Sequence, residues 1–199
     1  MISTVIMAGG KARRMGGKDK AFIKLQNKPI LSYIIEKIST QTDNIVLNSN
    51  NNPVDFLKFK IEVIPDVISG HPGPLAGILT GMEWSYKKNK KIEWIVSLPV
   101  DSPFFPDNLV MRLYESAKKN NKLIAVASSL GRTHPVFAIW NMSLRVKLKI
   151  SLNNGVRKID QFTENFNPSV VYFEDKHDPF FNINTPEDIK LAEKIMLSY

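Results

Sequence analysis

The chain has 199 residues, of which 43% are hydrophobic and 23% charged, as in an ordinary globular protein. No apolar stretch approaches the ~20 residues of a membrane-spanning helix, and the N-terminus lacks the basic lead of a secretory signal. The chain has no cysteine, which excludes disulfides and cysteine metal sites and is typical of a cytoplasmic protein. The net charge of +8 favours a polyanionic partner, such as a nucleic acid, an anionic membrane or a phosphorylated small molecule.

Apolar segments rich in β-branched residues alternate along the chain with segments of helical spacing. We expect strands at Thr4–Ala8, Asn44–Asn48, Lys60–Ile64, Trp94–Leu98, Leu123–Ala127, Val136–Trp140 and Val170–Phe173. We expect helices, by their apolar faces, at Ile30–Ile38 after Pro29, Leu75–Met82, Leu109–Ala117 and Ile189–Met196. The last helix has the clearest start, because Thr185 is a natural N-cap and Pro186 suits the first helical position.

This alternation predicts an α/β fold, in which right-handed crossovers give a mostly parallel sheet with helices on both faces. No repeat, low-complexity tract or linker interrupts the pattern, so we expect one domain over residues 1–199. Ligands of such sheets bind beyond the carboxyl ends of the strands. One segment does not fit the scheme: Leu144–Leu152 alternates apolar and polar residues like a strand, although the family resemblance described below favours a helix there.

A basic glycine-rich loop, residues 8–20, follows the first expected strand. Its four glycines would let backbone N–H groups approach an anion, and basic residues such as Arg14 and Lys20 would neutralise phosphates. Residues 11–20 hold five basic residues and one acidic residue, so half of the net charge lies here. The loop is not a P-loop, because Ala12 and Asp19 stand where glycine and Ser or Thr would be needed. A flexible surface loop is the alternative, but its place after a strand favours a nucleotide loop.

Polar residues also follow other expected strands. Asp101, between Pro99 and Pro103, is a hard oxygen ligand that would suit Mg²⁺, although Asp-Ser-Pro is equally a good turn sequence. Asn48 and Asp66 could read a base edge or bind a ribose, or be ordinary loop residues.

Three further features are less informative. Gly73 and Gly77 open a helix whose first turn would bring backbone donors to the same edge, or they simply form a tight loop. His71, His134 and His177 lack metal-ligand spacing, and His134 on its expected strand suits a structural role. The three tryptophans do not interleave with the basic loop, which argues against a nucleic-acid stacking surface.

Together these segments resemble the molybdenum cofactor guanylyltransferase family. The similar blocks occur in family order and span nearly the whole chain: Met7–Lys20, Asn48, Asp66, Gly73–Gly77, Asp101–Phe104, His134–Phe137 and Phe181–Asp188. Met7 replaces the leucine that is common in the family. The resemblance implies a Rossmann-like nucleotidyltransferase (GT-A-like) fold and transfer of GMP from GTP to the terminal phosphate of molybdopterin, with release of pyrophosphate.

The resemblance also implies roles for individual residues. Arg14, Lys20 and Asp101 would be catalytic, and Asp101 would ligate Mg²⁺. The nucleotide would be bound by Met7, Ala8, Gly9, Gly10, Lys20, Asn48, Asp66, Gly73, Gly77 and Asp101. His134, Asn182 and Asn184 would lie toward the pterin. We expect a cytoplasmic monomer whose partners are GTP, molybdopterin, other cofactor-assembly proteins and chaperones of apo-molybdoenzymes, with no nucleic acid or membrane among them.

Two rival functions remain. The nearer is another nucleotidyltransferase of this architecture, such as a cytidylyltransferase of the same pterin or a sugar-phosphate enzyme. Related cytidylyl enzymes tend to have Ala-Ala-Gly where this chain has Ala8-Gly9-Gly10, which favours guanine. The other rival is a non-catalytic nucleic-acid-binding protein, which would need basic residues spread along a groove with aromatic platforms.

Overall fold

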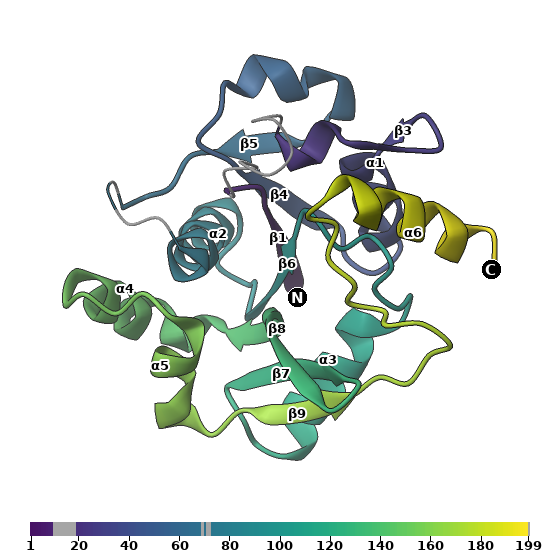
Figure 1. The fold of residues 1–199 in the computed structure, drawn as a ribbon. Helices are drawn as coiled ribbons and strands as arrows, with labels where there is room; N and C mark the ends of the chain where they lie inside the picture. Colours follow the sequence, from purple (N-terminus) through teal and green to yellow (C-terminus); the bar gives the residue numbers. More distant parts are fainter. Residues whose placement is uncertain (10–18, 69, 71–72, 199) are drawn as a thin grey trace.

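A computed structural model describes residues 1–9, 19–68, 70 and 73–198, which form a seven-stranded sheet in the order β5-β4-β1-β6-β8-β7-β9 (Figure 1). The strands are β1 (Ile2–Met7), β4 (Asn44–Asn48), β5 (Glu62–Ile64), β6 (Trp94–Pro99), β7 (Ile124–Ser129), β8 (Arg132–Asn141) and β9 (Ser169–Tyr172). All neighbouring strands are parallel except β8, which is antiparallel to both β6 and β7. The predicted α/β fold with a mostly parallel sheet is therefore confirmed.

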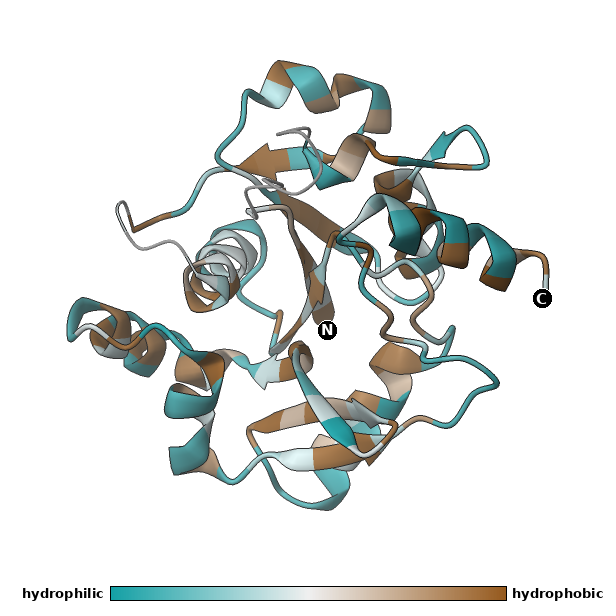
Figure 2. Cartoon of the chain, in the orientation of Figure 1, coloured by the Kyte–Doolittle hydropathy of each residue, from teal (hydrophilic) through white to brown (hydrophobic). Residues whose placement is uncertain are grey.

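Helices cover both faces of the sheet, as predicted. On one face lie α1 (Ile30–Ser39), α3 (Leu109–Lys119) and α6 (Pro186–Met196), and on the other lie α2 (Pro74–Lys88), α4 (Arg145–Asn153) and α5 (Ile159–Thr163) (Figure 1). Successive strand residues point to opposite faces, so that Ile6 packs in the first core and Val5 in the second. The central strands consequently contribute hydrophobic residues to both cores and are coloured mostly as hydrophobic in Figure 2. None of the helices in the described part of the chain is long and apolar enough to span a membrane.

Most element boundaries agree with the sequence to within two residues, although α2 continues six residues past Met82. Two strands begin later or earlier than expected for clear reasons. Strand β5 begins at Glu62 because Lys60, with φ 52°, ends a preceding 3₁₀ helix, Pro53–Phe59. Strand β8 begins at Arg132 because Leu130 and Gly131, with φ 47° and 75°, form a two-residue hairpin turn after β7. The short hairpin of β2 (Lys24–Leu25) and β3 (Lys28–Pro29) and the one-turn helix α5 were not predicted.

The strand-like alternation of residues 144–152 is misleading, and the helix that the family resemblance favours there is confirmed. The segment ends a 3₁₀ turn at Leu144 and continues as α4. Leu144, Leu148 and Leu152, spaced four apart, are buried on one helix face, whereas Val146 and Ile150 are exposed. Apolar residues at every second position include residues four apart, which share one face of a helix. The pattern alone therefore could not distinguish a strand from a helix.

The start of α6 agrees with the prediction in full. The Thr185 hydroxyl accepts from the Asp188 backbone N–H, and the Asp188 carboxylate accepts from the Thr185 N–H, which forms a reciprocal capping box. This box fixes the end of the segment that precedes the helix, and that segment contributes to the site described next.

Candidate functional site

The carboxyl ends of three neighbouring strands meet at one edge of the sheet. In the sheet register Met7 of β1 lies opposite Asn48 of β4 on one side and Pro99 of β6 on the other. The Ala8 N–H donates to the Asn48 carbonyl at 2.9 Å, and the Val100 N–H donates to the Met7 carbonyl at 3.0 Å. The start of the glycine loop, Asn48 and the Asp101 turn are therefore adjacent, as the strand-end pattern predicted.

A cleft of about 300 Å³ opens at this edge. Its lining includes eight residues singled out in the sequence: Met7, Gly9, Lys20, Asn48, Asp66, Gly73, Gly77 and Asp101. Ala8 is buried behind it. Gly10, Arg14 and His71 lie outside the described residues, as does the rest of the loop between positions 10 and 18.

Lys20 and Asp101 form an ion pair at one end of the cleft. The Lys20 Nζ lies 2.7 Å from the Asp101 Oδ2 and also donates to the Asn184 Oδ1. Both charged side chains are mostly shielded, with 15% and 17% of their surfaces exposed. Lys20 is positioned locally by Asp19, whose carboxylate accepts from the Ala21 N–H at 2.9 Å and caps the 3₁₀ helix Lys20–Phe22.

A segment remote in sequence closes the same end. The Ser102 hydroxyl donates to the Asn182 Oδ1, and the Ile183 N–H donates to the Asp101 carbonyl at 2.8 Å. Ser102 and Ile183 are fully buried. Asn182 and Asn184 therefore lie beside Asp101, although neither lines the cleft itself.

The other end of the cleft carries a carboxylate held by two amides. The Asp66 Oδ1 accepts from the Asn48 Nδ2 at 3.0 Å, and its Oδ2 accepts from the Asn50 Nδ2 at 2.8 Å. The Asp66 N–H in turn donates to the Asn50 Oδ1 at 2.9 Å. These bonds fix the orientation of the carboxylate while leaving lone pairs on both oxygens for a ligand.

Gly77 is required by the close approach of α2 to this edge. A Cβ there would lie 2.6 Å from the Asn48 Oδ1 and 2.9 Å from the Met7 Sδ, distances that real contacts do not show. Any side chain at position 77 would therefore displace two lining residues. A Cβ at position 73 would make only an ordinary contact, 3.5 Å from the Arg157 carbonyl. Lack of room for a side chain therefore does not explain why this residue is glycine.

The atoms around Asp101 suit a divalent metal ion. An ammonium group already lies between the Asp101 carboxylate and the Asn184 amide oxygen, so this position favours a cation. The described residues contain no cluster of three or more His, Cys, Asp or Glu side chains able to hold a metal. Such a cluster is not needed beside a nucleotide, because Mg²⁺ commonly takes one or two carboxylates together with phosphates and water. Asp101 is the candidate ligand.

His134 lies away from the cleft, in the interior of the β7–β8 corner. Its Nε2 is 2.8 Å from the Ser129 Oγ, and its ring packs against Phe180. Burial lowers the pKa of His134 below its usual value, and Asp178 only partly offsets this effect. This setting suits the structural role suggested by the sequence.

Sequence reasoning missed several residues that line the cleft: Asn50, Pro74, Pro99, Val100 and Val136. Asn50 could have been found from its place two residues after Asn48, beyond the same strand. Val136 lies within the similar block His134–Phe137, but nothing local marks it as a lining residue, because β8, which carries it, reaches this edge by pairing with β6.

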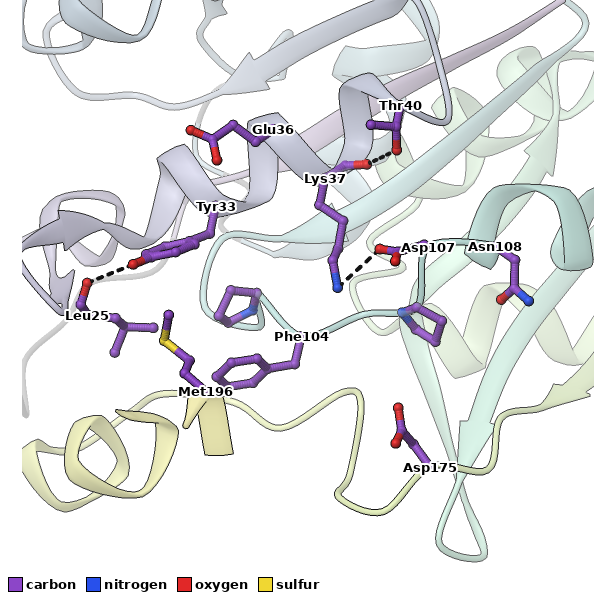
Figure 3. A pocket seen from close by; sticks show the side chains of 12 residues that line it. Leu25, Tyr33, Glu36, Lys37, Thr40, Phe104, Asp107, Asn108, Asp175 and Met196 are labelled. Carbon is purple, nitrogen blue, oxygen red and sulfur yellow. Dashed lines mark hydrogen bonds and ion pairs between the residues drawn. The ribbon is translucent and has the colours of Figure 1, made fainter. Parts of the chain in front are cut away.

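A second, larger cavity of about 980 Å³ is lined in part by the segment that follows Asp101, from Pro103 to Asn108. Leu25, Tyr33, Phe104 and Met196 form an apolar part of its lining (Figure 3). It shares no lining residue with the smaller cleft in the described part of the chain. It contains none of the residues that the sequence singled out as site residues.

Comparison with known proteins agrees with this geometry. Residues 4–166 match the family model of the MobA-like NTP transferase domain. A molybdenum cofactor guanylyltransferase of Rhodopseudomonas palustris (strain BisB5) is 42% identical over 195 residues, which cover 97% of this chain and 93% of the relative.

Solved structures show the same fold at lower identity. Molybdopterin-guanine dinucleotide biosynthesis protein A from Archaeoglobus fulgidus matches all of both chains with a TM-score of 0.80 and 24% identity. The 4-diphosphocytidyl-2C-methyl-D-erythritol synthase of Anaerococcus prevotii gives a TM-score of 0.76 at 14% identity, covering 99% of this chain and 96% of that one. By its domain match and its full-length relatives, this chain belongs to the MobA-like NTP transferases, within the molybdenum cofactor guanylyltransferase family.

Proposed function

We propose that this chain transfers GMP from GTP to the terminal phosphate of molybdopterin at the cleft between Asp66 and Asp101. One observation carries the proposal: an ammonium, a carboxylate and two amides converge beside the end of a basic glycine loop. That arrangement suits a triphosphate and its metal ion, and it occurs in a chain 42% identical to a guanylyltransferase.

The chemistry asks the protein chiefly for positioning. An oxygen of the molybdopterin phosphate forms a bond to the α-phosphorus of GTP. The bond from that phosphorus to the oxygen bridging to the β-phosphate breaks, and its electron pair leaves with pyrophosphate. A phosphate nucleophile is already ionised near neutral pH, so no serine, cysteine or general base is required. In-line placement of the two substrates and neutralisation of the charge that develops in the transition state account for the rate enhancement.

Individual residues would share this work. Lys20 would contact the phosphates, and Arg14 of the glycine loop would add charge beside them. Asp101 would hold Mg²⁺, with the neighbouring Asn184 amide oxygen in reach of the same cation. When bound, the ion screens the negative charge of the triphosphate and polarises its phosphoryl oxygens.

The Asp66 end of the cleft would bind the nucleoside. The backbone of Met7, Ala8 and Gly9 would line the guanosine, together with Asn48 and the carboxylate of Asp66. Guanine presents adjacent N–H donors on its Watson–Crick edge, and a fixed carboxylate that accepts two hydrogen bonds matches them. Cytosine has an acceptor at the corresponding ring nitrogen, which would face the same carboxylate unfavourably. This reasoning supports GTP over CTP, a choice that the fold shared with a cytidylyl enzyme leaves open.

The pterin would approach from the side of Asn182 and Asn184. The chain would act as one domain over residues 1–199, as a monomer in the cytoplasm, and would receive molybdopterin from other cofactor-assembly proteins. It would pass its product to chaperones of apo-molybdoenzymes. Sedimentation of the purified protein tests the monomer, and a dimer in dilute solution would contradict it.

The test of function is a nucleotide panel. The protein is mixed with molybdopterin, Mg²⁺ and GTP, CTP, ATP or UTP in turn, and products are identified by mass. We expect molybdopterin guanine dinucleotide and pyrophosphate from GTP. A higher yield from CTP would overturn the base assignment and keep the reaction class, whereas no dinucleotide from any nucleotide would overturn both.

A further inference from the structure

Three polar residues outside the cleft form a connected network. Ser129 ends β7, His134 lies on β8, and Asp178 lies in the segment between β9 and α6. The Ser129 Oγ is 2.8 Å from the His134 Nε2 and 2.7 Å from the Asp178 Oδ1. An aspartate carboxylate only accepts, so the single hydroxyl proton goes to Asp178 and the His134 Nε2–H donates to the hydroxyl oxygen.

This order of contacts excludes a nucleophilic triad. In a triad the imidazole lies between the acid and the hydroxyl and removes the hydroxyl proton. Here the serine lies between the other two, and its proton points to the carboxylate. Ser129 and His134 are also almost inaccessible, at 3% and 9% exposed. The network therefore has no reacting atom to present to a substrate.

Asp178 is the point at which the network fixes the chain. Its Oδ1 also accepts from the Phe180 N–H at 3.0 Å, and its carbonyl accepts from the Phe181 N–H at 3.2 Å. Its Oδ2 lies 3.5 Å from an exposed Arg132 guanidinium. Phe180 is fully buried, with ring centroids 4.7 Å from His134 and 4.6 Å from Phe137. The turn at residues 178–181 is thus held by both hydrogen bonds and packing.

The next residues reach the catalytic end of the cleft. Asn182 accepts from Ser102, the Ile183 N–H donates to the Asp101 carbonyl, and Asn184 accepts from Lys20. Immediately beyond them the capping box of α6 fixes the chain again. The segment 182–184 is therefore fixed at both ends, by the network at Asp178 on one side and by the capping box of α6 on the other.

We infer that Ser129, His134 and Asp178 are positioning residues, which hold Asn182 and Asn184 beside Asp101, on the side from which the proposed function has the pterin phosphate approach. The inference rests on the proposed function for the identity of that substrate. It gives His134 a structural role without contact to the pterin: its ring packs against Phe180, and its Nε2–H donates to the Ser129 hydroxyl.

The test compares paired variants by kinetics and by hydrogen exchange. Asp178→Ala removes the acceptor of both Ser129 and Phe180, whereas Asp178→Asn keeps one acceptor oxygen. Ser129→Ala removes the bridging hydroxyl. Ser116→Ala is the matched control, because Ser116 makes a similar 2.7 Å hydroxyl contact with Ser169 between α3 and β9, away from the cleft.

We expect Asp178→Ala and Ser129→Ala to raise the KM for molybdopterin about tenfold, as for loss of a buried hydrogen bond. The Kd for GTP should rise by clearly less than the KM for molybdopterin, because Lys20 keeps its ion pair with Asp101, and Asp178→Asn should recover most of the effect. Amide exchange in residues 180–184 should become faster in both alanine variants. Ser116→Ala should leave the KM and the exchange of this segment unchanged.

Equal losses of GTP and molybdopterin binding would overturn the inference, because they would show general damage to the fold. Unchanged exchange in residues 180–184 would overturn it as well. If Asp178→Ala does not fold, Ser129→Ala gives the same decision. Hydrogen exchange is measured without substrate. If the wild-type protein makes no dinucleotide, the proposed function is rejected, and exchange in residues 180–184 alone decides the positioning role.

Discussion

The two cavities lined in part by the Asp101–Asn108 segment each contain a lysine–aspartate pair, but in different surroundings. In the smaller cleft Lys20 and Asp101 are 15% and 17% exposed and 2.7 Å apart. In the larger cavity Lys37 and Asp107 are 3.3 Å apart, and the Asp107 side chain is 81% exposed. Water screens the second pair, whereas shielding from water strengthens the electrostatic attraction within the first. Surroundings and converging polar groups, rather than volume, distinguish the smaller cleft as the candidate site.

The strongest contrast should come from removing one charge in each cavity. Asp101→Asn should slow turnover by roughly 10²–10³, as for loss of one preorganised electrostatic group. Asp107→Asn should leave kcat/KM unchanged. The measurement is the initial rate of pyrophosphate release across a range of Mg²⁺ concentrations. Near-wild-type activity of Asp101→Asn at limiting Mg²⁺ would remove Asp101 from the metal site.

The paired lysines give the next largest contrast. Lys20→Ala should lower kcat/KM for GTP by about 10- to 100-fold, because a charged hydrogen bond to phosphate is lost. Lys37→Ala should lower the free energy of unfolding by about 0.2–1 kcal/mol, the usual effect of an exposed ion pair, without a change in rate. Equal kinetics for the two variants would show that Lys20 has no special part in the reaction.

Substitutions at two glycines of α2 should affect different properties, the geometry of the cleft at Gly77 and the packing of the core at Gly81. Gly77→Ala places a Cβ 2.6 Å from the Asn48 Oδ1, so we expect a several-fold higher KM for GTP. Gly81→Ala places a Cβ 2.6 Å from the Val5 Cβ and 2.7 Å from the Ile95 Cδ1, which should cost about 1–3 kcal/mol of stability by overpacking. Activity per folded molecule of Gly81→Ala should stay normal. Nucleotide titration and thermal unfolding measure the two effects, and a normal KM in Gly77→Ala would place the nucleotide away from Asn48.

The smallest effect is expected at the edge of the larger cavity. The Tyr33 hydroxyl donates to the Leu25 carbonyl at 3.0 Å. Tyr33→Phe should lower the free energy of unfolding by about 0.5–1.5 kcal/mol and leave kcat unchanged. Chemical denaturation and steady-state rates check both parts, and a changed kcat would mean that this cavity contributes to the reaction.

The strands and helices followed from local pattern where that pattern was unambiguous. The strand Asn44–Asn48 and the capped start of α6 were predicted correctly, because hydrophobic runs and caps are local signals. The alternation of residues 144–152 was ambiguous by itself, because only tertiary burial decides which apolar residues share a face, and there the family resemblance pointed to the helix. The hairpin turn at Leu130 was missed because leucine rarely adopts positive φ.

The site was predictable where it follows strand ends and not where it depends on distant chain crossings. Asn48 and Asp101 could be placed at one edge because parallel strands carry their carboxyl ends together. The contact of Lys20 with Asn184 joins residues 164 positions apart, and no local signal encodes it. The network of Ser129 with Asp178 was invisible for the same reason.

The most direct test is a crystal structure with Mg²⁺ and a non-hydrolysable GTP analogue. It should place the triphosphate beside Lys20 and the metal ion on the Asp101 carboxylate, with the base beside Asn48 and Asp66. A nucleotide bound in the larger cavity against Phe104 and Met196, or one that leaves Lys20 and Asp101 untouched, would contradict the account.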